Sequence, residues 1–281
     1  MKIKILLFSF TIFIGIINLN AQTLPINEVS SSLPCLDKNF NVRVVVTVDS
    51  TNREPLLTEE EINTLLSDAS YFFSPICMSF TSCSYDVIPN YSYNNLGTES
   101  RRIEMGVVYH YPRRITLFVV EEMSEDTRGK CGYSQLGGLN TRNNAQIFVS
   151  RSCSDGLPEQ FAHHMGTLLG LLDTNHEPGS ELVDGSNCTT AGDMICDTPA
   201  DSYGVLLNDT KSEWVPVHDT LLVETFLSGC DYKSNGTDIN GQFFNPNTTN
   251  IMSTYPCKCA FTREQFLKMV DNYDSTNILK Y

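Results

Sequence analysis

The sequence predicts an α+β fold with two parts, a layered part built on a mixed β-sheet and a smaller irregular part that ends in a helix. Three observations support this. Strand-like and helix-like segments alternate up to about residue 170, which is typical of a sheet covered by helices. Residues 171–250 are rich in Asn, Asp, Gly, Thr and Ser and have few periodic runs. A segment with helical spacing follows at 261–273.

The predicted strands are β-branched, apolar runs, as expected for a buried sheet. They cover residues 41–50, 76–88, 114–123 and 145–152. The Gly-rich stretch 132–140, GYSQLGGLN, is predicted to be a loop. It lacks the G-x-x-x-x-G-K-[ST] pattern of a phosphate-binding loop.

Three helices are predicted from apolar spacing and capping residues. The first covers 59–73 and is preceded by a capping box of Thr58 and Glu61. The second runs from about Leu157 to Leu169, where Gly170 ends it. The third is 261–273, with a second capping box, Thr262 and Gln265.

The first 21 residues have the features of a secretory signal peptide: a short basic start, an apolar run and a small-residue exit at Ala21-Gln22. The alternative, a membrane anchor, needs about 20 apolar residues, more than the run from Ile5 to Leu19 provides. We therefore expect a secreted, periplasmic or extracellular protein that has no membrane segment once the signal is removed. The expected organisation is a signal peptide (1–21), an N-terminal extension (22–40) and one domain (41–281), divided at about residue 170.

All ten cysteines follow the signal segment, and an even number in an exported chain predicts disulfides. The alternative, a zinc-thiolate cluster, needs C-x2-C spacing, which Cys257-Lys258-Cys259 does not have. The net charge of −14 disfavours nucleic acid as a partner, because nucleic-acid binding requires a basic face.

The helix sequence FAHHMGTLLGLLDTNH, residues 161–176, is similar to a zinc-protease helix whose chemistry has been replaced. In H-E-x-x-H, two His at i and i+4 bind zinc from one helical face, and the Glu is the general base. Here His163 occupies the first ligand position, His164 the Glu position and Thr167 the second ligand position.

Two further stretches extend the similarity: GDMICDTPADS at 192–202 and NIMSTYPCKCAFTREQ at 250–265. With G-L-L-D at 170–173, they resemble the pappalysin family of metzincin metalloproteases. That family has a G-D-x-x-x-D-T-P loop, a Met-turn and an F-T-x-x-Q helix after its active-site helix. The resemblance covers about residues 41–270.

The resemblance implies a metzincin-like fold. An upper subdomain (41–170) would hold a twisted mixed sheet and two helices, and a lower subdomain (171–281) would hold the Met-turn and the C-terminal helix. A polypeptide substrate would bind in the cleft between them. Met252 would be the Met-turn methionine. Its alternative role, that of a plain core methionine, involves the same packing.

The same resemblance assigns the family's catalytic positions, most of which are substituted here. Asp173 stands at the third zinc-ligand position, and Thr254 stands where family members commonly have an oxyanion-supporting Tyr. Tyr255 is one residue out of place. We therefore expect a pseudoprotease that keeps a polypeptide-binding cleft. The alternatives are an active zinc endopeptidase with an unorthodox ligand set and a structural or adhesive module.

For two possible metal sites the sequence supports two interpretations each. Glu159, His163, Asp173 and His176 could form a carboxylate-rich site, or else Glu159 bonds to His163 and His176 lies in a solvated loop. Some family members bind structural calcium near the D-T-P loop, and the carboxylates that could serve here are Asp193, Asp197 and Asp201. The alternative is that these residues cap turns through backbone N–H groups.

The irregular segment 171–260 needs bracing, because long segments without secondary structure are otherwise uncommon in compact domains. Cys188, Cys196, Cys230 and one of Cys257 or Cys259 are expected to be oxidised. The expected bridge ties the D-T-P loop to the Met-turn region.

Overall fold

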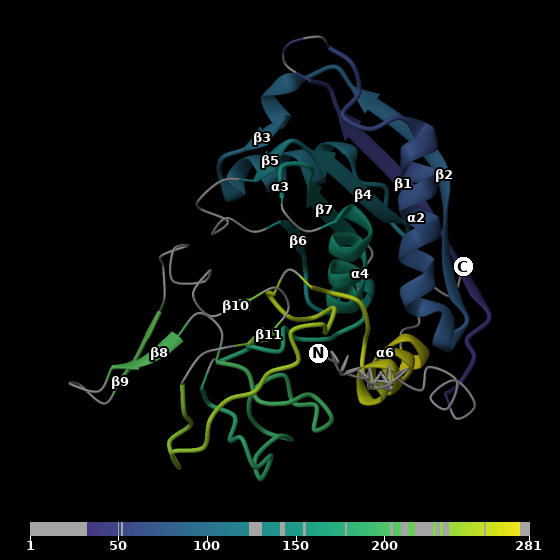
Figure 1. Cartoon of the computed structure of the whole chain (residues 1–281). Helices are drawn as coiled ribbons and strands as arrows, with labels where there is room; N and C mark the ends of the chain where they lie inside the picture. Colours follow the sequence, from purple (N-terminus) through teal and green to yellow (C-terminus); the bar gives the residue numbers. More distant parts are fainter. Residues whose placement is uncertain are drawn as a thin grey trace, which may run out of the picture.

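In the computed structural model, four parallel strands and one antiparallel strand form the central sheet (Figure 1). The parallel strands are β1 (Lys38–Thr47), β2 (Met78–Ile88), β4 (Ile115–Val120) and β7 (Gln146–Ser150). The antiparallel strand is β6 (Gly132–Ser134). The order across the sheet is β2-β1-β4-β7-β6, so β2 and β6 are the edge strands. The predicted α+β class with a mixed sheet is confirmed.

The structure describes residues 33–49, 51, 53–123, 131–140, 144–153, 156–177, 179–202, 205–208, 213–216, 227–228, 231–232, 236–255 and 257–275. The predicted signal peptide and Cys230 lie outside these residues. Three short strand pairs complete the described set. They are β3 (Asn95–Leu96) with β5 (Glu122–Met123), β8 (Val205–Asn208) with β9 (Glu213–Pro216), and β10 (Leu227–Ser228) with β11 (Asp231–Tyr232).

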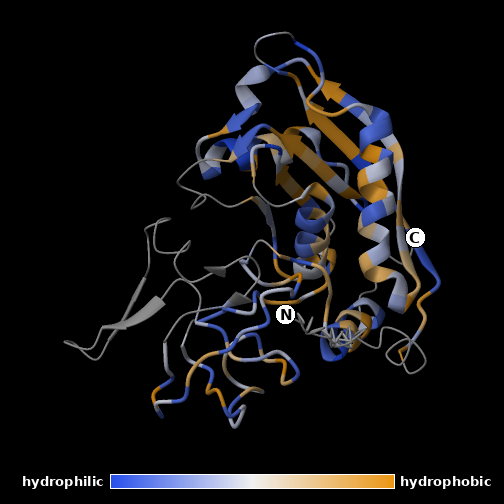
Figure 2. Ribbon diagram, in the orientation of Figure 1, coloured by the Kyte–Doolittle hydropathy of each residue, from blue (hydrophilic) through white to orange (hydrophobic). Residues whose placement is uncertain are grey.

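Both faces of the sheet are covered, which explains why the inner strands β4 and β7 are continuous apolar runs rather than alternating ones. Val44 and Val46 of β1 face the main core with helices α2 (Glu59–Phe73) and α4 (Leu157–Leu168). Val45 faces a second cluster that includes Met105 of helix α3 (Glu99–Tyr109). In Figure 2 the central strands are correspondingly coloured as hydrophobic.

Helices α2 and α6 (Arg263–Ser275) begin at the predicted capping boxes. The Thr58 side chain accepts from the backbone N–H of Glu61, whose carboxylate accepts from the N–H of Thr58. Gln265 and Thr262 exchange the same pair of bonds at the start of α6. Each box satisfies two N–H groups that a helix start leaves without partners.

Two predictions for the upper part were wrong. It contains three α-helices rather than two, because α3 forms where no element was expected. The stretch 132–140 is not a simple loop, since it provides strand β6 and the short 3₁₀ turn Gly138–Asn140. The second difference matters for function, because it places Gly132–Ser134 at the edge of the sheet.

The irregular part, residues 171–275, packs against the sheet layer mainly through residues 250–255 and helix α6. Buried Met252 and Ile251 belong to the same core cluster as Met269 of α6 and Met165 of α4. A backbone hydrogen bond from Thr174 N–H to Met252 O, 3.0 Å, joins the chain after α4 to the predicted Met-turn. Residues 250–255 therefore pack against α4 as a largely buried segment.

Three disulfides link described cysteines: Cys35–Cys77, Cys131–Cys153 and Cys188–Cys196. Cys257 is also disulfide-bonded. The oxidation of Cys188, Cys196 and Cys257 is thus confirmed. The expected tie to the Met-turn region is wrong for Cys188 and Cys196, because they bond to each other.

The even count of cysteines did not mean that every one is bridged, because Cys83 and Cys259 are free and exposed. Cys83 lies where the register of β2 against β1 shifts by one residue. Among the described helices, none combines the length and the apolar character needed to cross a bilayer.

The Cys35–Cys77 bridge is expected to contribute more stability than Cys188–Cys196, because it closes 42 residues rather than eight. In the chain-entropy model these loops correspond to about 4 and about 2.5 kcal/mol. Urea unfolding of the two double Cys→Ser variants measures both. Cys83→Ser is the control and should leave the midpoint unchanged. Equal midpoints for the wild type and the Cys35/Cys77 variant would contradict the expectation.

Candidate functional site

Helix α4 and the turn after it bring three predicted ligand positions together. The helix buries Phe161, Met165 and Leu168 against the core. Gly170 then reverses the chain in the left-handed region, with φ +89°, a conformation that a side chain disfavours. The turn carries Asp173 back to the exposed side of the helix, next to His163.

Both ring nitrogens of His163 are engaged. Its Nδ1 lies 2.9 Å from the carbonyl oxygen of Ile251, so this nitrogen carries the proton that is donated to the carbonyl. Its Nε2 lies 3.1 Å from Asp173 Oδ1. The His163 side chain is 12 % exposed and that of Asp173 is 45 % exposed, so the pair lies at the boundary between core and solvent.

The remaining ligand position does not contribute to this pair. The Thr167 hydroxyl donates to the carbonyl of His163, 3.2 Å away, which is the usual bond of a helical Thr to the preceding turn. A structural zinc has four protein ligands and a catalytic zinc has three plus water, from Cys, His or carboxylate groups. Two side chains that hydrogen-bond each other do not meet this requirement, so the donor set does not fit zinc.

The alternative carboxylate-rich site is not formed by the described residues. His163 contacts Asp173 of this set, but its Nδ1 is bonded to the carbonyl of Ile251, and Glu159 folds back towards Gly156 at the start of the helix. His176 is exposed in the loop. Across the part of the chain that the structure describes, no three His, Cys, Asp or Glu side chains are grouped to hold a metal.

His164 points to the sheet edge rather than to Asp173. Its Nδ1 lies 3.3 Å from Ser134 Oγ on β6. A side chain at position 132 would begin 2.3 Å from His164 Nε2 and 2.3 Å from the carbonyl oxygen of Phe148. Only glycine therefore lets the imidazole lie this close to β6. The rings of His163 and His164 pack edge to face, with centroids 5.0 Å apart.

Met252 lies directly under α4. A side chain at Gly166 would begin 2.7 Å from the Met252 sulfur, so the helix approaches the turn at close range. Tyr255 is fully buried and donates to Asp201 Oδ1 at 3.0 Å, which removes it as a substitute for the oxyanion Tyr. The hydroxyl oxygen of Thr254 is buried and has no hydrogen-bond partner among the described residues.

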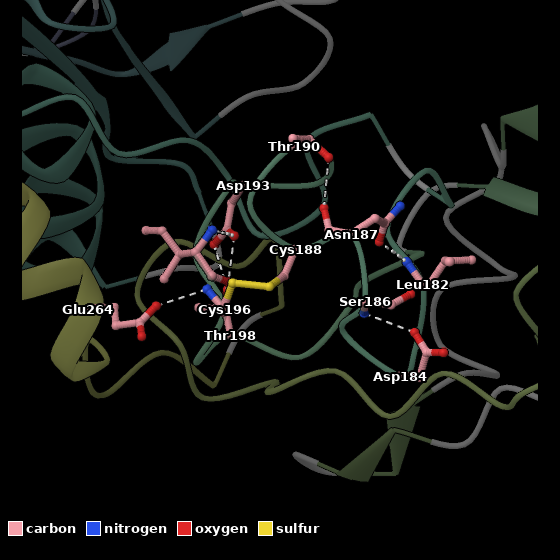
Figure 3. The surroundings of a disulfide bond; sticks show 11 residues. Leu182, Asp184, Ser186, Asn187, Cys188, Thr190, Asp193, Cys196, Thr198 and Glu264 are labelled. Atoms are coloured by element: carbon pink, nitrogen blue, oxygen red, sulfur yellow. Dashed lines mark hydrogen bonds between the residues drawn. A yellow bond between two sulfur atoms is a disulfide. The ribbon is translucent and has the colours of Figure 1, made fainter.

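The D-T-P loop is fastened to α6 by hydrogen bonds (Figure 3). Cys196 N–H donates to the Glu264 carboxylate at 2.9 Å. Glu264 N–H donates to Asp197 Oδ2 at 2.8 Å. Asp193 accepts from Ile195 N–H and from the Thr198 hydroxyl at 3.0 and 2.9 Å. Asp193 and Asp197 thus form the capping bonds that were weighed against a calcium role.

Three buried carboxyl groups lie in this region, on Glu181, Asp193 and Asp201, and each is less than 5 % exposed. Burial raises the pKa of Asp193 to about 7. Burial, followed by repulsion from Asp193 and Asp201, raises the pKa of Glu181 to about 8. Asp201 accepts from Thr174 and Tyr255 hydroxyls at 2.8 and 3.0 Å. Buried charges of one sign require a proton or a cation.

Sequence reasoning missed two of these residues. Ser134 lay in a stretch predicted to be a loop, although the alternation G-Y-S before a Gly-rich turn could have indicated a short strand. Glu181 gave no usable signal, because it lies in an irregular segment without periodicity. Its position beside Gly192, where a side chain would begin 2.2 Å from the Glu181 carboxylate, depends on the folded path of the chain.

Comparisons with known proteins place no family on this chain. No family model matches it, and no curated protein matches it. One similar solved structure is described as the structure of a chaperone-substrate complex, with a TM-score of 0.34 and 17 % identity. The match covers 50 % of this chain and 25 % of that one. The chain thus spans about a quarter of the length of the matched structure.

Proposed function

We propose that this chain is a secreted, pappalysin-like member of the metzincin metalloproteases that has lost ordinary proteolysis and keeps a polypeptide-binding surface. The observation that carries the proposal is the His163–Asp173 pair, 3.1 Å apart. It occupies the predicted ligand positions above Met252, yet the two side chains contact each other without a third ligand.

Several contacts support the family-like arrangement. His163 is held by the carbonyl of Ile251 within N-I-M-S, and Gly166 lies against Met252. The loop containing D-T-P is bonded to the start of the F-T-x-x-Q helix. These contacts join all three stretches on which the resemblance rests. They were not needed to recognise the motifs, so they are independent support.

Loss of proteolysis follows from chemistry. Zinc lowers the pKa of bound water to about 7, which supplies hydroxide at neutral pH. Thr167 offers a neutral hydroxyl that is already bonded to the helix backbone. Replacement of a general base costs about 10²–10⁴-fold, and loss of an oxyanion donor about 10²–10³-fold. These losses in rate do not simply add. Each would act on a site that already lacks the second and third zinc-ligand histidines.

A polypeptide ligand is favoured by the position of β6. This strand is at the edge of the sheet and next to α4. An edge strand presents backbone N–H and C=O groups with which an extended peptide can pair. A ligand bound in this way would pass His163 and His164 without requiring catalysis.

Zinc should be absent from the exported protein after a chelation step, because only His163 and Asp173 remain as ligand-type side chains at the three positions. Elemental analysis measures retained zinc, and casein and gelatin assays measure cleavage. His163→Ala is the control and should have the same zinc content as the wild type. About one tightly held zinc per chain together with cleavage would favour the active endopeptidase instead.

Peptide binding separates the proposal from a structural or adhesive module. We expect casein-derived peptides to slow amide hydrogen exchange in residues 131–135. The opposite edge strand, β2, is the internal control and should be unaffected. Equal or absent protection at both edges would contradict a binding surface at β6.

A further inference from the structure

We propose that Ser134 and His164 form a nucleophile–base pair that accepts acyl groups from esters. The inference stands on their contact and does not require that the chain be a metalloprotease relative. Ser134 Oγ and His164 Nδ1 are 3.3 Å apart, a separation in the looser range of nucleophile–base pairs without bound substrate. Both side chains are half-buried, so an acyl donor can reach them.

The imidazole is positioned as a base should be. The neutral tautomer that accepts from Ser134 at Nδ1 has its proton on Nε2, and both this nitrogen and the carbonyl oxygen of Phe148 border Gly132. Both atoms lie 2.3 Å from the point where a Gly132 side chain would begin. The absence of a side chain at Gly132 lets the imidazole lie this close to β6. The edge-to-face contact with His163 further limits rotation of the ring.

His163 is itself held at both nitrogens, by Ile251 and Asp173. The support for His164 is therefore a fixed ring rather than a mobile one. Ser134 lies on strand β6, whose bonds to β7 fix its backbone. Nucleophile and base thus come from two rigid elements, which is the arrangement that positions reacting groups best.

The chemistry balances without a metal or oxidant. Ser134 Oγ attacks the ester carbonyl carbon, its proton passes to His164 Nδ1, and a bond forms between Oγ and the acyl carbon. The C–O bond to the alcohol breaks, and the departing alkoxide takes the proton from His164. Water then hydrolyses the acyl-serine to a carboxylic acid. Esters are favoured over amides because an alkoxide leaves more readily than an amine anion.

The described contacts show no oxyanion donor for this pair. A missing oxyanion donor slows acyl transfer by about 10²–10³-fold. This loss applies to acylation and to hydrolysis of the acyl-serine alike. With p-nitrophenyl acetate, whose aryloxide leaves readily, acylation should be the faster step, so the acyl-serine should accumulate and give a burst of about one equivalent followed by slow turnover.

The test treats the exported full-length mature protein with p-nitrophenyl acetate and with a fluorophosphonate, in chelator. In the second reaction Oγ bonds to phosphorus and fluoride leaves. Mass spectrometry of the wild type should place both labels on Ser134. Ser134→Ala should abolish labelling, and His164→Gln should slow it about 10²-fold or more.

The matched controls are Ser92→Ala and His176→Gln, which alter an exposed serine and an exposed histidine elsewhere. Both should label at the wild-type rate. Circular dichroism checks that each variant is folded, and the label position on the wild type decides the matter if one is not. Labels distributed over other serines, or an unchanged rate in His164→Gln, would overturn the inference. Because chelator is present throughout, these outcomes are independent of zinc content.

Discussion

The triple substitution His164→Glu, Thr167→His and Asp173→His is expected to create a zinc site that retains about one ion per chain, where the wild type retains none. Position 167 lies one helical turn after His163, on the same face of α4. The side chain at 173 already reaches within 3.1 Å of His163 Nε2. Two histidines at these positions would complete a set of three imidazole ligands.

Zinc affinity should rise far more than proteolytic activity. Thr254 would still stand where family members commonly have the oxyanion-supporting Tyr. The missing Tyr hydroxyl alone would lower the rate of cleavage by about 10²–10³-fold. Zinc content after dialysis, together with casein cleavage, measures the two effects separately. His164→Glu alone is the control, because it restores the base but supplies no ligand.

A folded triple variant that remained free of zinc would mean that the backbone of α4 and its turn has diverged from the arrangement assumed here. The assignment of His163, Thr167 and Asp173 to ligand positions would then be wrong.

In chelator, Glu181→Gln is expected to gain stability relative to the wild type as the pH rises from about 5.5 to about 9. A carboxyl whose pKa is raised by folding stabilises the protein below the unfolded pKa, and this stabilisation is lost as the pH rises through the folded value. For Glu181 that window runs from 4.5 to about 8. Glutamine has a similar shape and no charge, so it removes the titration.

The difference in unfolding free energy between the variant and the wild type should grow by about 3 kcal/mol across this range. The neighbouring charges are Asp193 and Asp201, which repel the carboxylate. Lys268 acts on Asp193 in the opposite direction. Urea unfolding at each pH measures the change, and Asp184→Asn, at an exposed carboxyl with a lowered pKa, should show no such gain.

Calcium is the alternative way to neutralise these carboxyls, and calcium bound near Asp193, Asp197 and Asp201 stays a proposal. Calcium binds carboxylate oxygens, so at pH 9 it should stabilise the wild type by about 2.7 kcal/mol at a hundredfold excess over its Kd. Glu181→Gln should lose that gain. If calcium changed the unfolding free energy of neither the wild type nor Glu181→Gln, the carboxyls would be neutralised by protons alone.

Local patterns in the sequence predicted most of the main elements. The inner strands β4 and β7 required no tertiary information, because each is a continuous apolar run buried on both faces. The capping boxes at Thr58 and Thr262 fixed the starts of α2 and α6, since both partners of each box lie within four residues.

Helix α3 was not predicted because three of its apolar residues face solvent, although Met105 is buried. Ile103, Val107 and Val108 are exposed, while Arg102 is buried. The pattern is therefore reversed relative to that of an ordinary amphipathic helix. Arg102 is accommodated by an ion pair with Glu99 in the same helix and by stacking on the Tyr133 ring at 3.4 Å. The Tyr133 contact joins distant segments, so no short sequence window could contain it.

The candidate site divides in the same way. The sequence alone determined that the H-E-x-x-H motif is substituted, because residue identity at fixed helical spacing can be read directly from it. Only the tertiary structure decided what replaces it. The His163–Asp173 pair, the Ser134–His164 contact and the burial of Glu181 beside Asp193 each join residues from different segments. Such contacts depend on how the chain folds back on itself, and the energies of buried charges and hydrogen bonds depend on those surroundings.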